Sequence, residues 1–323
     1  MRKSLFIGLL VAILSVVSMF PFLKSNAANT PRHNGSTAGS RLPSATLPDY
    51  DIRVAGKGEF MDYDLNSTAG TLNAAQDNAT RARVSALAEF RSTISPDKAD
   101  NLRAVVNEAG AIKNLFIDGA PLSEAQSDTA DRIARNFLSE HTALFALSET
   151  DVAGLALVSE DNDAGTTFLK YSQTVGGFKV FEGGVQVVVN KVGQVLSVRE
   201  GFLVSERPAK LKASISEAGA LAAAFRYAGK SVGEKFVETA QRATKGDTAR
   251  FANPLGPDFE DVLSELNVVR VGNAGRLAWH SYAEVGPNEW YEMLVDAQTG
   301  EFLLRHNLYV FDAQGTVYTE DPG

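Results

Sequence analysis

Histidine is the residue type that could most readily hold a catalytic metal in this chain. The histidines are His33, His141, His280 and His306. A zinc hydrolase site needs two ligands at i and i+4 on one helix face and a carboxylate base, but no H-E-x-x-H or H-x-H unit occurs. His280 stands in an alternating strand-like run and His306 follows Arg305, so we interpret both as polar strand residues. The chain also has no cysteine. We therefore predict no catalytic residue, no metal ligand and no cofactor in this chain.

Serines and carboxylates offer two further kinds of chemistry. Ser172, Ser197 and Ser281 lie in strand-like runs without a G-x-S-x-G turn. The members of a catalytic triad can be far apart in sequence, so an unrecognised hydrolase stays open as an alternative. Four carboxylates gather near one expected hairpin, and they are Glu289, Glu292, Asp296 and Glu301. A paired-carboxylate glycosidase site would use such groups, but their strand-edge and turn positions favour a solvated turn.

An aromatic set on facing strands is a candidate binding surface. Its members are Trp279, Tyr282, Trp290 and Tyr291. Core and cross-strand packing is the plainer interpretation, and contact with a partner protein is the sharper one, because Trp and Tyr are favoured interface anchors. We keep these four, together with Val317 and Tyr318 near the end of the sequence, as the partner-contact candidates.

The first half of the chain predicts helices followed by strands. A helix is expected over 73–94, then strands over 105–111 and 114–117 around a turn at Gly110. Apolar residues at i, i+3, i+4, i+7 and i+8 from Ala130 predict a second helix, capped by Asp128 or Ser127. Strands follow over 167–173, 178–181, 185–190 and 194–199. The glycine pairs 176–177 and 183–184 are interpreted as hairpin turns, and Gly193 as another.

The second half repeats this plan. Ser214 and Glu217 have the spacing of a capping box, the helix continues through Ala228, and Gly229 stands where a C-terminal cap belongs. Strands are expected over 264–271, 276–284, 289–295 and 301–308. We therefore predict an α+β fold with two helix-on-antiparallel-sheet modules in tandem.

The N-terminus indicates export. Arg2 and Lys3 precede an apolar run over 5–20, and Ser25-Asn26-Ala27 supplies the small residues that a signal peptidase reads. An uncleaved membrane anchor is the alternative. Residues 28–72 are rich in Pro, Gly and Ser without apolar periodicity, so we expect a disordered linker there.

The charge of the exported part excludes one class of partner. Removal of residues 1–27 leaves 28 Lys and Arg against 39 Asp and Glu, a net charge of −11. Nucleic acid binding needs clustered positive charge, so we expect no nucleic acid partner, and no membrane association after cleavage.

Several segments, taken in order, resemble the propeptides of fungalysin-type secreted metallopeptidases. The clearest is Tyr171-x-Gln173-x-x-Gly176-Gly177-x-x-Val180-Phe181-x-Gly183-Gly184. It is preceded by similar segments over 111–123 and 133–148. Leu277-Ala278-Trp279 and Val295-Asp296-Ala297-x-Thr299-Gly300-Glu301 resemble the second, PepSY-like module of such propeptides. The catalytic zinc motif of the family is absent from the sequence.

The resemblance implies a domain plan and a function. The plan is a signal peptide (1–27), a linker (28–72), an FTP-like propeptide module (73–205), a PepSY-like module (206–310) and a junction (311–323) toward a catalytic domain. The implied role is intramolecular chaperone and inhibitor of a metallopeptidase domain, acting in cis or in trans, with zinc belonging to that partner domain. The implied location is extracellular, with the periplasm as the alternative. A stand-alone exported protease inhibitor or binding module remains the other non-enzymatic interpretation.

We expect the mature protein to begin near Ala28, because the small residues before it suit signal peptidase. Mass spectrometry of secreted protein would locate this terminus. An intact Met1 terminus in a membrane fraction would favour the anchor instead.

Overall fold

The computed structural model describes residues 47–53, 63–64, 78–106, 112–145, 147–240, 247–272 and 274–309. The helices of this part are α2 (Asn78–Thr93), α3 (Pro96–Ala99), α4 (Ala130–Glu140), α5 (Thr142–Phe145), α6 (Glu149–Ala153) and α7 (Glu217–Tyr227). The first strands are β1 (Tyr50–Asp51), β2 (Tyr63–Asp64), β3 (Leu102–Val106), β4 (Ile112–Ile117), β5 (Ala156–Asp163), β6 (Thr166–Val175), β7 (Phe178–Val189) and β8 (Val195–Gly201). The remaining strands are β9 (Glu238–Ala240), β10 (Ala249–Phe251), β11 (Val262–Val271), β12 (Ala274–Gly286), β13 (Glu289–Asp296) and β14 (Phe302–Asn307). The α+β class predicted from the sequence is confirmed.

The strands follow two antiparallel runs that meet at one parallel contact. The first run has the order β5-β6-β7-β8-β4-β3-β2, and the second has β1-β14-β13-β12-β11 with β10 and β9 continuing from β11. The two runs join where Val180 of β7 pairs with Val268 of β11. The predicted meander over 264–308 is confirmed as β11 to β14, with strand ends moved by a few residues.

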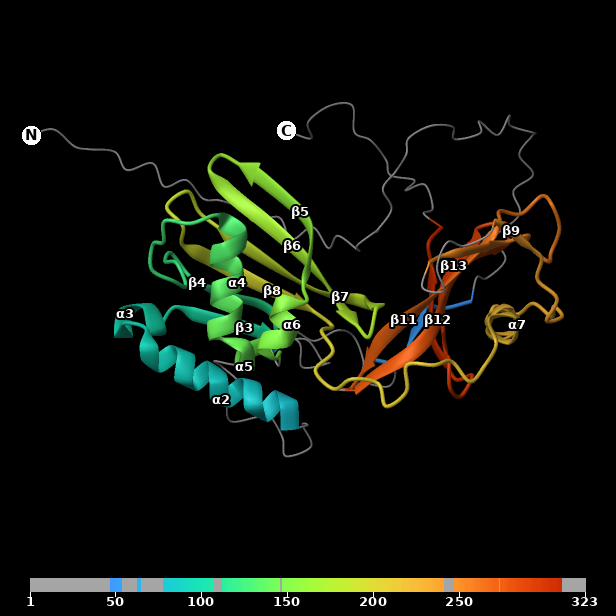
Figure 1. The fold of residues 1–323 in the computed structure, drawn as a ribbon, viewed down its shortest axis with the longest axis horizontal. Coiled ribbons are helices and arrows are strands. Elements are labelled where there is room, and N and C mark those ends of the chain that lie inside the picture. Colours follow the sequence, from blue (N-terminus) through green and yellow to red (C-terminus); the bar gives the residue numbers. More distant parts are fainter. Residues whose placement is uncertain are drawn as a thin grey trace, which may run out of the picture. The chain divides into compact units, whose positions relative to one another are not determined.

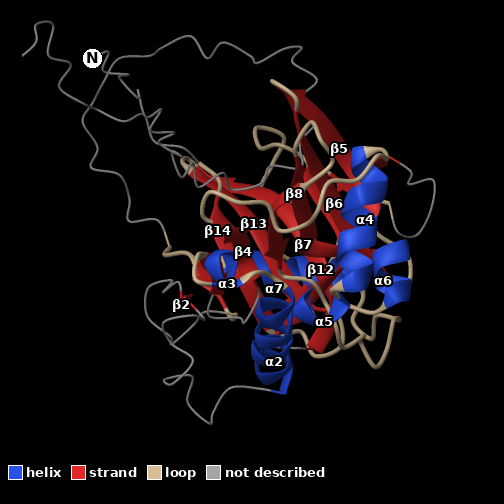
Figure 2. Ribbon diagram, turned by 90° about the vertical axis from the view of Figure 1, so that its left-hand side faces the viewer, coloured by secondary structure: helices blue, strands red, loops and turns tan. Residues whose placement is uncertain are grey.

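Helices cover one face of each run. In Figure 1, α2, α4, α5 and α6 gather beside strands β3 to β8, whereas α7 lies beside β12 and β13. Figure 2 shows α4 beside β6. The larger buried cluster of the first run includes Phe137, Phe145 and Val187, and that of the second includes Phe225, Tyr291 and Met293. Burial of these apolar side chains under the helices is the main stabilising term for each part.

Helix α4 forms because its apolar residues recur along one face, as their spacing in the sequence predicts. Ile133, Ala134, Phe137 and Leu138 are all buried along one face. Its N-cap differs from the expected Asp128 or Ser127, because the side chain of Thr129 accepts the amide hydrogen of Arg132. Asp128 instead accepts the amide of Thr129 at 2.7 Å.

The start of α7 also corrects the sequence interpretation. Ser216, and not Ser214, caps the helix by accepting the amide of Gly219 at 3.1 Å. Ser214 is held by the strand-turn region, since its amide donates to the carbonyl of Ala297 at 2.8 Å. Gly229 follows the helix with φ of 76°, a conformation that glycine adopts at little cost.

Of the two glycine pairs predicted as turns, one prediction is wrong. Gly176 and Gly177 have φ of 60° and 85° and turn β6 into β7, as expected. Gly183 and Gly184 instead lie inside the continuous strand β7. A side chain at Gly184 would collide with the backbone carbonyl of Tyr171 on β6, so this glycine permits close approach of two strands.

The predicted linker over 28–72 contains ordered segments. Tyr50 and Asp51 pair with Arg305 and Leu304 of β14, and Tyr63 and Asp64 pair with β3. Arg305 also donates from Nη2 to the carbonyl of Pro48 at 2.8 Å. Pairing with an existing sheet edge needs backbone groups rather than apolar periodicity, so composition gave no signal for it. The signal peptide (1–27) and the junction (311–323) lie outside the described residues.

Glycine substitutions provide a test of this fold. Gly193 (φ 78°) and Gly177 (φ 85°) both have a left-handed backbone conformation. A Cβ added at Gly193 would collide with the carbonyl of Gln126 and would lie 3.0 Å from the side chain of Ile133, whereas a Cβ at Gly177 would meet no atom within 4 Å. We expect Gly177→Ala to cost about 1–2 kcal/mol in unfolding free energy and Gly193→Ala clearly more. Urea unfolding would measure both, and equal losses would contradict the close approach at Gly193.

Candidate functional site

Two of the four aromatic candidates are core residues. Trp279 is 7% exposed and its indole nitrogen donates to the carbonyl of Ile215 at 3.1 Å. Tyr291 is fully buried in the cluster beneath α7. Both side chains therefore pack in the core, as the packing interpretation of the sequence predicted, on the sheet face that α7 covers.

The other two aromatics lie on the opposite face of β12 and β13. Trp290 is 40% exposed, and Tyr282 is half-buried with its hydroxyl donating to Glu292 Oε1 at 2.8 Å. Side chains alternate along a strand, so Trp290 shares its face with Glu292. Val317 and Tyr318 lie outside the described residues. Of the predicted set, Trp290 is thus the aromatic that is most available to a partner.

Tyr282 belongs to a polar cluster centred on His280. The imidazole is 4% exposed, with Nε2 at 2.9 Å from Glu292 Oε1 and Nδ1 at 3.8 Å from Glu265 Oε1. Thr248 and Asn267 donate to Glu265 at 2.6 and 2.9 Å. Register brings these groups together, because His280 pairs directly with Glu265 of β11 and Tyr282 with Glu292 of β13.

The electrostatics of this cluster favour a protonated imidazole between two carboxylates. Burial would lower the pKa of His280, but the nearby charge of Glu265 and the hydrogen bond and charge of Glu292 raise it above the ordinary value. Burial would raise the pKa of Glu265, but the nearby imidazole of His280, the hydrogen bonds from Thr248 and Asn267 and the charge of Lys179 lower it to about 2. The pKa of Glu292 is likewise lowered, because its bond to His280 outweighs its burial. Burial and the neighbouring Glu292 raise the pKa of Tyr282.

The sequence draws attention to His280 and Glu292 separately but does not indicate Glu265. The available signal was the cross-strand alignment of three consecutive meander strands, which requires the exact register. Ser281, the neighbouring serine, is 2% exposed and points to the other face by strand alternation, so it does not complete a triad with His280.

The remaining carboxylates of the hairpin are engaged in ion pairs. Asp296 Oδ2 and Glu301 Oε2 lie 2.7 and 2.6 Å from the guanidinium of Arg276, and Glu289 lies 3.3 Å from Lys230 Nζ. Asp296 also accepts the amides of Gln298 and Thr299 in the turn. This is the arrangement of a structural hairpin rather than a pair of carboxylates flanking a bond.

The other described histidines lie apart. The ring of His141 packs edge-on against Phe90 and Phe137, and His306 Nε2 is 3.5 Å from Asp49. Within the described ranges, no three His, Cys, Asp or Glu residues are placed so that they could hold a metal ion.

Comparison with known proteins gives one family match. Residues 153–200 match the Fungalysin/Thermolysin Propeptide Motif. The motif begins at the end of α6 and contains β5, β6, β7 and nearly all of β8, so the resemblance seen in the sequence is confirmed over these strands. No curated protein matches the chain.

A solved structure, the Bacillus megaterium YpeB C-terminal domain, is similar at 14% sequence identity. The alignment covers 66% of this chain and 79% of that chain, with a TM-score of 0.26.

The propeptide motif ends at a buried carboxylate that ties three elements together. Glu200 of β8 is fully buried, with Oε1 at 3.0 Å from Arg83 of α2 and 3.4 Å from Arg270 of β11. Its Oε2 accepts the amide of Ile112 at 3.3 Å. Burial raises the pKa of Glu200, and the two guanidinium groups oppose that rise. We assign the ionised form at neutral pH, because two cations and an amide converge on it.

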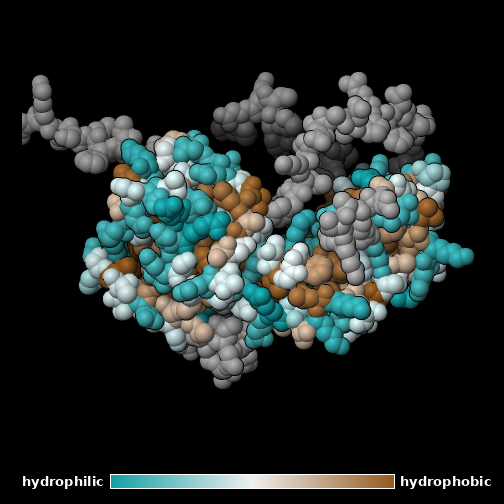
Figure 3. All heavy atoms as spheres, viewed as in Figure 1, coloured by the Kyte–Doolittle hydropathy of each residue, from teal (hydrophilic) through white to brown (hydrophobic). Residues whose placement is uncertain are grey.

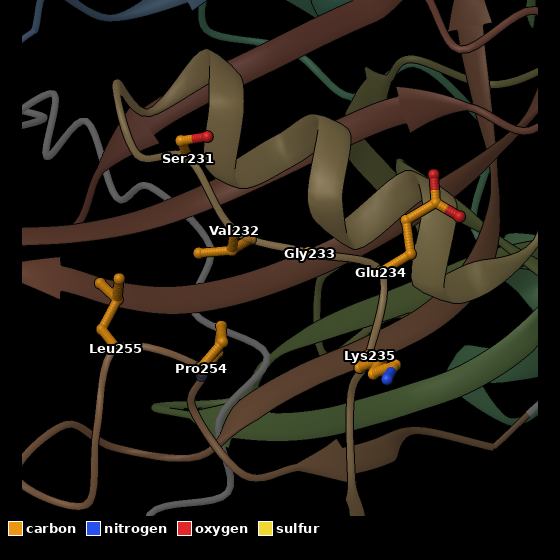
Figure 4. Close-up of a pocket in the computed structure, with 7 residues that line it drawn as sticks. All are labelled: Ser231, Val232, Gly233, Glu234, Lys235, Pro254 and Leu255. Atoms are coloured by element: carbon orange, nitrogen blue, oxygen red, sulfur yellow. The ribbon is translucent and has the colours of Figure 1, made fainter.

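The described surface has an open hollow beside α7. It measures about 720 Å³ and is lined by residues 231–235, Pro254 and Leu255. Figure 4 shows Glu234 and Lys235 with their side chains directed apart around it. Its polar lining residues are Ser231, Glu234 and Lys235. The surface seen in Figure 3 mixes polar and apolar residues, and its apolar residues form separate small patches.

None of the helices in the described ranges has the length and apolar character that crossing a bilayer requires.

Removing the buried anion should be costly. We expect Glu200→Gln to lower the unfolding free energy by about 3–5 kcal/mol, since Arg83 and Arg270 would lose their common counter-charge. Asp118→Asn is the matched control, because Asp118 pairs with Arg103 at 3.2 Å on the surface and should cost about 0–1 kcal/mol. Denaturant unfolding would measure both. A loss below about 1 kcal/mol for Glu200→Gln would contradict the assignment.

Proposed function

We propose that this chain is the propeptide region of a secreted zinc metallopeptidase precursor, where it assists folding of the peptidase domain and inhibits it until removal. The match of residues 153–200 to the propeptide motif carries the proposal. The zinc belongs to the partner domain, and this chain is not itself the enzyme.

The architecture supports such a role. We interpret residues 73–205 and 206–310 as two modules in tandem, each with its own helix-covered buried cluster. The ion pair between Glu200 and Arg270 links the two modules beside the contact of β7 with β11. The two modules can therefore present one continuous surface to a partner. Inhibition of an enzyme requires a stable complementary surface rather than a catalytic group, and a preorganised surface binds with less loss of conformational freedom.

Attachment in the same chain would make modest intrinsic affinity sufficient. A tethered partner experiences a high effective concentration, so a propeptide can block its own peptidase domain in cis while binding weakly in trans. Val317 and Tyr318, which follow β14 in the sequence, are proposed to contact the partner. An extended segment can lie in a peptidase cleft as a substrate does.

We expect purified residues 28–323, added in trans, to slow the peptidase domain encoded with this chain and to increase its refolding yield. Hydrolysis of a peptide substrate by the isolated peptidase domain would measure inhibition. Unchanged activity at a large excess of the chain would contradict the trans form of the proposal, and a gene without any downstream or neighbouring zinc peptidase would contradict the cis form.

Two variants sharpen this test. Trp290→Ala should weaken inhibition at least about tenfold if the exposed indole is an interface anchor. Leu157→Ala is the control, because Leu157 on β5 is also 40% exposed but lies in the other strand run. A chain lacking residues 313–323 tests the contact assigned to Val317 and Tyr318.

A further inference from the structure

A histidine borders the contact between the first strand run and the second. His280 lies on β12, and its ring packs edge-on against Phe181 of β7 with ring centres 5.0 Å apart. Lys179, also on β7, lies 3.7 Å from Glu265, the carboxylate beside His280. The His280 cluster is therefore part of the contact between β7 and the second run, next to the Val180–Val268 pairing.

The segment before the first run is fixed at the same place. Arg53 is 6% exposed and bonds to Asp51 and to Glu182 of β7 at 2.6 and 2.8 Å. Its guanidinium also lies over the rings of Phe181 and Phe202. Phe181 is thus in contact with both the Arg53 guanidinium and the His280 ring.

The charges around His280 come from every element packed on it. They are Glu265 of β11, Glu292 of β13, Tyr282 of β12, Lys179 and Glu182 of β7, and Arg53, with His306 of β14 acting on Glu292. Glu265 and Glu292 also accept hydrogen bonds from other side chains. The imidazole of His280 is the group that lies between these two carboxylates.

We propose that protonated His280 ties β11, β12 and β13 together where Phe181 of β7 packs on its ring, and that this support for β7 loosens in alkaline solution when the imidazole loses its proton. Proton loss leaves two largely buried carboxylates on either side of a neutral ring. Neutral imidazole has one N–H, so either Nδ1 presents a lone pair toward Glu265 or Nε2 presents one toward Glu292. Either tautomer weakens the contact with one of the two carboxylates.

The direction of the effect follows from linkage. The pKa of His280 is raised in the folded protein, so the stability it contributes is fully present below the unfolded value of about 6.5. This contribution is lost as the pH rises through the folded pKa. If the proposed propeptide function holds, alkaline conditions also favour release of the peptidase domain; the tests below need no peptidase and so stand apart from that function.

The test uses residues 28–323 between about pH 5.5 and 9.5, the range in which histidine titrates. The thermal midpoint, the NMR titration of the His280 ring and hydrogen exchange of β7 residues 178–182, corrected for intrinsic rate, are measured together. For the wild type we expect the midpoint to fall and β7 exchange to rise as the His280 ring titrates.

Three variants separate the charge of His280 from its packing. His280→Gln should remove the alkaline fall. Glu292→Gln should move that fall to lower pH by about 1–3 units, because one of the two anions that stabilise the imidazolium is gone. Glu301→Gln, a matched change on an exposed carboxylate that pairs with Arg276, should leave it in place.

The proposal is overturned if His280→Gln keeps the wild-type alkaline fall, if Glu292→Gln leaves its position unchanged, or if β7 exchange does not follow the titration. Should His280→Gln fail to fold, Glu292→Gln and the ring titration decide the matter by the same criteria.

Discussion

The burial of Glu200 between two arginines is the constraint on which the arrangement of the described elements depends. One carboxylate at the end of the propeptide motif contacts Arg83 of a helix, Arg270 of the second strand run and the amide of Ile112. A charge taken out of water is tolerated only with such partners, so α2, β8 and β11 must meet at this point. The apolar clusters supply most of the stabilisation, and Glu200 restricts how they are combined.

The second polar contact between the strand runs differs in its response to protons. The two arginines around Glu200 stay charged at all physiological pH values. His280 lies between two carboxylates, but its own charge depends on a proton that histidine can lose. The region where the two strand runs meet therefore contains both arginine cations and a titratable cation.

Among the described residues, the polar groups of the hairpin and of the His280 cluster pair with one another. Asp296 and Glu301 contact Arg276, Glu289 pairs with Lys230, and the imidazole of His280 lies between carboxylates. Such pairing keeps a protein surface rigid, which suits the propeptide role that we propose from the motif over residues 153–200.

The sequence by itself determined what depends on neighbours within a few residues. The helical spacing of Ile133 to Leu138, the turn at Gly176 and Gly177 and the meander after Val262 follow from local periodicity and backbone preference. Only the tertiary structure decided that Gly184 admits a neighbouring strand rather than a turn, since the same residue type serves both needs. It also decided the ionic contacts of Glu200 and His280, because partners far apart in sequence meet only when the register and packing of distant strands are set.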